Sequence, residues 1–153
     1  MKNEKSLNVL LVEDDKMNAE VLKKFIKTNA KVDEVDVQTI NEVDRVLNEI
    51  QRSDVKPHVV ILSEPAHGKI KFANEVPSRI NQIKKLIPAS EIIVLSTPNK
   101  VETVIDTFRS GAYDVVLKDE HTSKNVINSI HRFLSSREEK SAAKKQKDLS
   151  TTY

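Results

Sequence analysis

Acidic, hydroxyl and lysine side chains follow directly after four short apolar runs in this chain of 153 residues. Carboxylates bind hard cations such as Mg²⁺, whereas hydroxyl and ammonium groups can contact phosphoryl oxygens. If the four runs are neighbouring parallel strands, their carboxyl ends meet at one edge of a sheet. The set is therefore a candidate phosphoryl-transfer site. Its members are Glu13 and Asp14 after the first run, Ser63 and Glu64 after the second, Ser96 and Thr97 after the third, and Lys118 and Asp119 after the fourth.

The four runs have the length and composition of buried strands. They occupy residues 8–12, 58–62, 91–95 and 114–117 and are rich in Val, Ile and Leu. Continuous apolar character indicates strands covered on both faces, as in parallel sheets. Residues 34–40 alternate instead, which predicts a fifth strand with one exposed face at the edge of the sheet.

Segments with apolar residues at helical spacing lie between these strands. Strand and helix alternate five times, which predicts an α/β fold with a doubly wound parallel sheet. The stripes are Val21, Leu22, Phe25 and Ile26; Val43, Val46, Leu47 and Ile50; Ile80, Ile83 and Ile87; Val101, Val104, Ile105 and Phe108; and Val126, Ile127, Ile130 and Leu134.

Prolines and one glycine indicate where helices begin and end. Residues 65–77 show no clean period, so we expect the third helix only over residues 79–87, ended by Pro88. Pro98 suits the entry to the fourth helix, and Gly111 suits the C-terminal cap of that helix.

Composition excludes several classes of site. The chain has no Cys, which rules out disulfides, thiolate metal sites and cysteine nucleophiles and favours a cytoplasmic location. The polar N-terminus predicts no signal peptide, and no apolar run is long enough to predict a membrane span. Residues 137–153 carry five of the 25 basic and three of the 23 acidic residues, which leaves the preceding part neutral. We therefore expect no nucleic-acid binding by the domain itself.

The apolar periodicity stops after Leu134. We expect one domain over residues 1–136. Residues 137–153 then form a charged C-terminal tail, either disordered because it buries too little apolar area, or a continuation of the last helix into solvent.

Four segments together resemble a known family. LLVEDD, PHVVILSEPAHG, IIVLST and GAYDVVLKD look like the signature segments, in order, of the receiver domain of bacterial response regulators, and the resemblance covers residues 7–134. It implies a flavodoxin-like (βα)5 fold with strand order 2-1-3-4-5 and a role in two-component phosphorelay signalling. It also implies that Glu13 and Asp14 bind Mg²⁺ and that Ser96 and Lys118 complete the site. Ser63 holds the place of the phosphoacceptor aspartate, as in a pseudo-receiver.

Several positions depart from the family pattern. Serine supplies no carboxylate to a metal, and a phosphoserine would be a stable ester, so Mg²⁺ binding is expected to be weak or lost. His67 stands where the family has proline, and a proline occurs two residues earlier instead, at Pro65. Asp119 follows Lys118 at a position where the family commonly has proline. The loop at 65–68 is therefore expected to be remodelled. Glu64 could replace the missing carboxylate, but it is one residue further on and should point to the other side.

Three functions are consistent with these residues. The first is a signalling module, not an enzyme, that binds a kinase, phosphotransfer domain or output protein without a phosphoryl switch. Its binding face would be the fourth helix, fifth strand and fifth helix, which could also form a homodimer. The second is a conventional receiver with another acceptor, such as Glu64. The third is a small α/β enzyme, although the sequence has no Gly-rich phosphate loop.

The same residues could instead have purely structural roles. Ser63 could cap the turn after its strand, and Lys118 could form a structural ion pair with the two acids. Asp15 is expected to cap the first helix.

Overall fold

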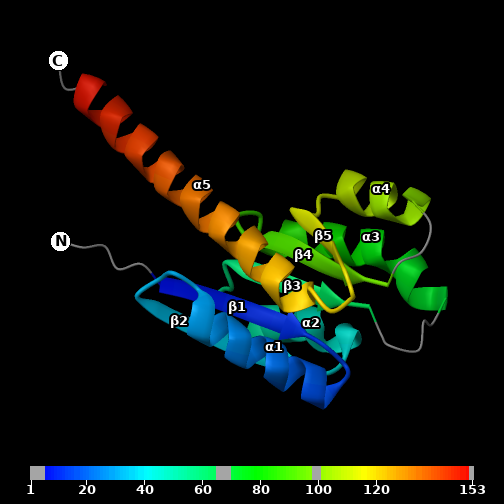
Figure 1. Ribbon diagram of the computed structural model, residues 1–153. Coiled ribbons are helices and arrows are strands. Elements are labelled where there is room, and N and C mark those ends of the chain that lie inside the picture. Colours follow the sequence, from blue (N-terminus) through cyan, green and yellow to red (C-terminus); the bar gives the residue numbers. More distant parts are fainter. Residues whose placement is uncertain (1–5, 65–69, 98–100, 152–153) are drawn as a thin grey trace.

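A parallel five-stranded sheet forms the centre of the protein (Figure 1). The computed structural model describes residues 6–64, 70–97 and 101–151. The strand order is β2-β1-β3-β4-β5, as predicted. The strands are β1 (Ser6–Val12), β2 (Glu34–Ile40), β3 (Val59–Ser63), β4 (Glu91–Ser96) and β5 (Asp114–Leu117).

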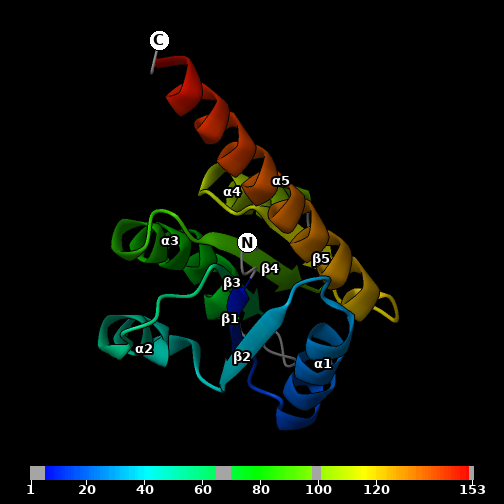
Figure 2. The same cartoon turned by 90° about the vertical axis from the view of Figure 1, so that its left-hand side faces the viewer.

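Helices cover both faces of this sheet, so the doubly wound α/β architecture is confirmed. Figure 2 shows α1 and α5 on one face and α2 and α3 on the other, and α4 contacts α3 and β5. The helices are α1 (Lys16–Asn29), α2 (Val46–Arg52), α3 (Ile70–Leu86), α4 (Val101–Arg109) and α5 (Thr122–Thr151), with a short 3-10 turn, η1 (Val43–Arg45), before α2.

Two apolar clusters, one on each face, hold the layers together. Ile61 of β3 packs toward α1 and α5 with Ile26 and Ile130, whereas Leu62 packs toward the other face with Ile80 of α3. Every residue of β3 is buried, as expected for a central strand covered on both sides. Each apolar side chain of this strand contributes about 1.5–3 kcal/mol relative to leaving it in water. The edge strand β2 keeps Asp36 and Gln38 exposed, in agreement with its alternating sequence.

Helix α3 differs from the sequence prediction. It begins at Ile70, not near Arg79, and contains Pro77. Proline inside a helix removes one backbone hydrogen bond and costs about 3 kcal/mol. Burial of Val76, Ile80 and Ile83 against the sheet offsets that cost. The helix ends before Pro88, as expected.

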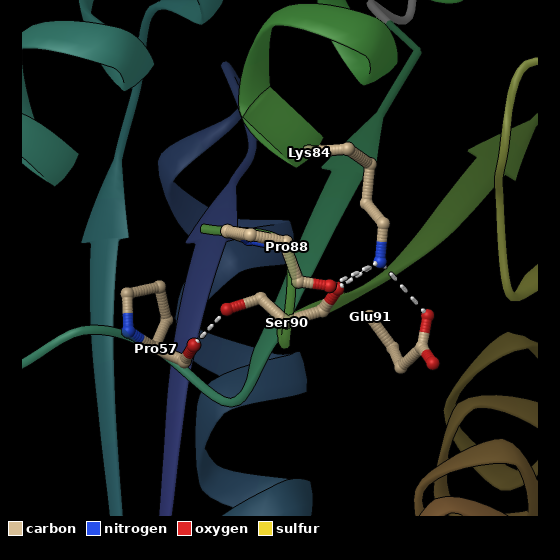
Figure 3. Close-up of polar contacts among 5 residues, drawn as sticks. All are labelled: Pro57, Lys84, Pro88, Ser90 and Glu91. Carbon is tan, nitrogen blue, oxygen red and sulfur yellow. Dashed lines mark hydrogen bonds and ion pairs between the residues drawn. The ribbon is translucent and has the colours of Figure 1, made fainter. Parts of the chain in front are cut away.

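A polar cluster fixes the turn from α3 into β4, at the amino edge of the sheet (Figure 3). The Lys84 ammonium donates to the carbonyl oxygens of Pro88, at 3.0 Å, and Ser90, at 2.6 Å, and lies 3.4 Å from the Glu91 carboxylate. The buried Ser90 hydroxyl donates to the carbonyl of Pro57, just before β3. These contacts supply donors to backbone carbonyls of the turn and of the segment before β3, and so tie the end of α3 to both strands.

Gly111 ends α4, as predicted, in the backbone geometry that glycine favours. Its φ is +111°, its N–H donates to Phe108, and the Ala112 N–H donates to Thr107. The two crossed hydrogen bonds are those of a Schellman motif.

Residues 137–151 continue α5 as a helix, which is the second of the two alternatives expected for this segment. The extension contains neither Gly nor Pro and is rich in Ala, Lys and Glu, which favour helix. It continues a helix that is already nucleated, which removes the main cost of helix formation. No helix in the described part of the chain is both long and apolar enough to cross a membrane.

Candidate functional site at the carboxyl edge of the sheet

The ends of β1, β3, β4 and β5 bring five of the candidate residues together. Val12 pairs with Leu62 in the sheet register, which places Glu13 next to Ser63. Ser63 pairs with Leu95, which places Glu64 next to Ser96. Ser96 pairs with Leu117, which places Ser96 close to Lys118. The register alone therefore assembles the site.

Ser63 is bound to Glu13. Its hydroxyl donates to Glu13 Oε1 at 2.6 Å, and both side chains are only 5% exposed. The second oxygen, Oε2, accepts the backbone N–H of Asp15 at 3.0 Å. Ser63 therefore does more than occupy a strand end, because its hydroxyl donates a hydrogen bond to a buried carboxylate.

Burial raises the pKa of the Glu13 carboxyl above its usual value, and contact with Asp14 adds to the rise. The Ser63 hydroxyl, the Asp15 N–H and the positive charge of Lys118 act in the opposite direction on this pKa. Burial disfavours the charged form of a carboxyl, and these three groups offset part of its effect on the pKa of Glu13.

Glu64 turns toward β4, away from Glu13. Its Oε1 accepts the Thr97 N–H at 2.6 Å and the Thr97 hydroxyl at 2.8 Å, and it lies 3.2 Å from the Ser96 hydroxyl. Its side chain is 4% exposed. The hydrogen bonds of Glu64 run to the end of β4, whereas that of Ser63 runs to Glu13 after β1. Sequence reasoning did not predict this role of the Glu64 carboxylate.

Lys118 lies between the two acidic groups. Its ammonium donates to the backbone carbonyl of Glu64, and its charge acts on Glu13. The backbone N–H of Lys118 donates to the Ser96 carbonyl at 2.8 Å, which continues the β4–β5 ladder.

The other two acids after β1 lie on the surface. Asp14 is exposed. Asp15 is the N-cap of α1, as predicted, because its carboxylate accepts the Asn18 N–H at 2.9 Å.

A Mg²⁺ ion would find a poor ligand set here. Both oxygens of Glu13 already accept hydrogen bonds, and Ser63 directs its proton at that carboxylate. Within residues 6–64, 70–97 and 101–151, no group of three His, Cys, Asp or Glu side chains could hold a metal ion. The residues present therefore do not fit the metal that the resemblance implies.

A cavity of about 300 Å³ opens beside the site, between α1 and the start of α5. Its walls include Glu13, Val21, Leu22 and Lys118. This volume lies at the lower end of the range for small-molecule pockets.

Two of the three described histidines make contacts away from the site. His58 Nδ1 accepts the Asn8 N–H at the amino edge of the sheet, and His131 Nε2 accepts the Lys31 N–H. His121 is exposed, and its backbone N–H donates to Asp119 Oδ1 at 2.7 Å. The expected remodelling at 65–68, including Pro65 and His67, lies outside the described residues.

Comparisons with known proteins agree with this fold. No family model matches the chain, and no curated protein does. Solved structures do match. The BeF3-activated receiver domain of DrrB superposes with a TM-score of 0.65 at 21% identity, over 85% of this chain and 98% of that one. A response regulator from Thermotoga maritima gives 0.64 at 17%, over 82% and 98%. NtrX from Brucella abortus gives 0.69 at 19% over 93% of this chain, which spans only 30% of NtrX.

The chain has the receiver-domain fold. At these identities the likeness extends to the fold alone, and what the site does is argued below from its own residues.

Proposed function

We propose that this protein is a receiver-like signalling module of a two-component pathway that acts through protein–protein contact, without a phosphoryl switch. One observation carries the proposal: the side chain at the end of β3 is a serine whose hydroxyl donates to Glu13 at 2.6 Å. An acceptor aspartate would present a carboxylate there. Serine offers no carboxylate to phosphorylate, and its hydroxyl is buried.

The state of Glu64 argues against its use as a substitute acceptor. An acceptor carboxylate must reach a phosphodonor from solvent. Glu64 is 4% exposed and its Oε1 already accepts hydrogen bonds from Ser96 and Thr97. Phosphorylation of Glu64 would break these contacts.

Exposed apolar side chains on α4 and β5 support the proposed partner face. Ile105 and Phe108 of α4 are 43% and 45% exposed, and Leu117 of β5 is 43% exposed. The periodicity of α4 predicted a helix with Ile105 and Phe108 on its apolar stripe, and the structure leaves both exposed. A cluster of exposed apolar groups marks a surface suited to protein contact. The proposed partners are a kinase, a phosphotransfer domain or an output protein, and a second copy of the chain would use the same face.

The phosphorylation test uses intact mass. The wild-type chain is incubated with Mg²⁺ and a small-molecule phosphodonor such as acetyl phosphate, beside Glu64→Gln. We expect no added phosphoryl mass on either protein. A hydroxylamine-labile adduct on the wild type would overturn the proposal. Its loss in Glu64→Gln would identify Glu64 as the acceptor.

The partner face is tested by Phe108→Asp. We expect this variant no longer to bind the partner, or no longer to self-associate in sedimentation. Its unfolding free energy should stay within about 0.5 kcal/mol of wild type because the side chain is exposed. The matched control is Val55→Asp, an exposed apolar residue (60%) between α2 and β3. Equal loss of binding in both variants would argue against the α4–β5 face.

A catalytic role for the site has less support. The Ser63 hydroxyl donates to a carboxylate, His58 and His131 are engaged elsewhere, and the exposed His121 donates its backbone N–H to Asp119. We therefore assign no catalytic step to these residues.

A further inference from the structure

The Glu64 carboxylate lies in a cluster of donors at the end of β4. One oxygen, Oε1, lies within 3.2 Å of three donors, which are the Thr97 N–H, the Thr97 hydroxyl and the Ser96 hydroxyl. The Ser96 hydroxyl also lies 3.2 Å from the Thr97 carbonyl. The carboxylate is buried. Several convergent donors from consecutive residues around one oxygen form an arrangement that suits an anion, whichever anion is present.

We propose that Glu64 is a permanent intramolecular occupant of the anion-binding groups of this site, in the place that a phosphoryl oxygen would otherwise take. The inference rests on the proposed function only in identifying the group that Glu64 replaces as a phosphoryl group. The occupied anion site itself follows from the hydrogen bonds of Glu64, Ser96 and Thr97.

The charges around the site agree with an internal occupant. Glu13, Asp14, Glu64 and Asp119 bring carboxyl groups to this edge, and the described cation that contacts Glu64 is Lys118. A phosphate dianion added to the wild-type site would meet the Glu64 carboxylate directly, so it would be repelled from the donors that it needs. The wild type should therefore be insensitive to phosphate.

Removal of the carboxylate reverses that situation. Glu64→Ala takes away one negative charge and the carboxylate oxygen that the Thr97 N–H and the hydroxyls of Ser96 and Thr97 approach. The loss of an acceptor from such donors is costly. A tetrahedral oxyanion such as phosphate carries oxygens that can accept from all of them, with the Lys118 ammonium nearby.

A purely structural role makes a different prediction. If Glu64 only ties the end of β3 to the end of β4, any neutral acceptor serves equally well. Glu64→Gln retains an acceptor oxygen, so it would then match the wild type in stability. Glu64→Ala would be destabilised without gaining a response to phosphate.

The experiment follows thermal unfolding of the full chain in sodium phosphate against sodium chloride at equal ionic strength. The proteins are wild type, Glu64→Ala, Glu64→Gln and the control Ile83→Ala, a core truncation on α3 that reports how much phosphate stabilises any weakened version of this fold. We expect Glu64→Ala to gain roughly 3–5 °C in Tm from phosphate at tenfold excess over its Kd, beyond the gain of Ile83→Ala. Wild type should show no such excess, and Glu64→Gln should be less stable than wild type.

Two results would overturn the inference. One is an equal phosphate response in Glu64→Ala and Ile83→Ala, and the other is Glu64→Gln with wild-type stability. If Glu64→Ala is unfolded in chloride, the inference requires phosphate to restore its folded fraction, and no recovery counts against it. A phosphorylated wild type in the mass experiment would overturn the proposed function instead, so the two failures are distinguishable.

Discussion

Residue 63 determines how many charges this edge of the sheet must accommodate. A hydroxyl there donates to Glu13, whereas a carboxylate would compete with Glu13 for the same donors. The serine therefore stabilises the buried acid that the family resemblance assigns to metal binding. Ser63 and Glu13 are coupled by this one hydrogen bond.

Ser63→Asp should reverse this relation. Without a divalent cation, two carboxylates would face each other in a buried position, and we expect a loss of about 3 kcal/mol in unfolding free energy. Added Mg²⁺ should recover part of the loss, because Glu13, Asp14 and the new Asp form a three-carboxylate oxygen ligand set. Urea unfolding with and without Mg²⁺, at constant ionic strength, measures both effects.

The control for this substitution is Ser63→Ala. It removes the hydroxyl and leaves Glu13 one donor short, which should cost about 1–3 kcal/mol with no response to Mg²⁺. Full stability of Ser63→Asp in the absence of metal would show that the two carboxylates are not held together.

His58 should make stability depend on pH. Burial lowers its pKa below the usual 6.5, and the charge of Arg137 lowers it further. Its Nδ1 accepts the Asn8 N–H at 2.9 Å, so a proton there would break that bond. The unfolded chain binds the proton more readily. The contribution of His58 is therefore present above about pH 6.5 and lost as the pH falls through the lower folded value.

The comparison of wild type with His58→Asn isolates this contribution, because asparagine keeps an acceptor near the position of Nδ1. We expect the wild type to lose more unfolding free energy than the variant between about pH 7.5 and about pH 5.5. The raised pKa of Glu13 acts in both proteins, so it cancels in the difference. Parallel pH profiles would contradict the assignment to His58.

At the scale of elements, signals confined to a few residues predicted most of the fold. Continuous apolar runs identified β3 and β4, and alternation identified β2 as an edge. The start of α3 was missed, because Pro77 is a local signal against helix and the compensation comes from tertiary burial of Val76 and Ile80. The period of α4 predicted a helix but not how much of its apolar side is covered, so the exposure of Ile105 and Phe108 could not be foreseen.

The candidate site divides in the same way. Its residue types and strand-end positions are local, so Glu13, Ser63, Ser96 and Lys118 were predicted. The bond between Glu64 and Thr97 joins residues 33 positions apart, and it depends on how the chain leaves β3. No spacing rule contains that information. An acid directly after the expected acceptor position was the only available signal.

Gly111 provides a test of element boundaries. A Cβ added there would meet Ile80 and Lys84 at 3.6 and 3.9 Å, which is ordinary contact, so space is not the constraint. The positive φ is. We expect Gly111→Ala to lose about 1–2 kcal/mol in chemical denaturation, and Gly111→Asn to lose less because asparagine tolerates positive φ better. Equal stability of all three proteins would mean that α4 can end without this backbone geometry.

At the scale of the whole molecule, α5 belongs to two environments. Its first half is buried against the sheet through Val126, Ile130 and Leu134, and its second half extends away from the domain (Figure 1). Arg137 lies at the transition. It donates to the Ser6 carbonyl at 3.0 Å, and its guanidinium lies 5.7 Å from the centre of the Phe133 ring.

Two truncations locate the end of the stabilising contacts. A chain ending at Lys140 retains Arg137 and loses a segment in which residues 141–144 and 146 are exposed, so its unfolding free energy should stay within about 0.5 kcal/mol of the full chain. A chain ending at Ser136 loses the Ser6 and Phe133 contacts and should lose about 1 kcal/mol more. Urea denaturation measures both values, and ellipticity at 222 nm should fall in each truncation as helix is removed.

Arg137→Ala in the full chain is the matched control, because it removes the same two contacts while keeping the helix. If it reproduces the loss seen on ending at Ser136, the folded unit extends one residue past the predicted boundary at 136. If the chain ending at Lys140 is already destabilised, the exposed half of α5 supports the domain, and the boundary must move toward Thr151. In the first case the extension is free to join the receiver-like domain to a partner without affecting the sheet that holds the site.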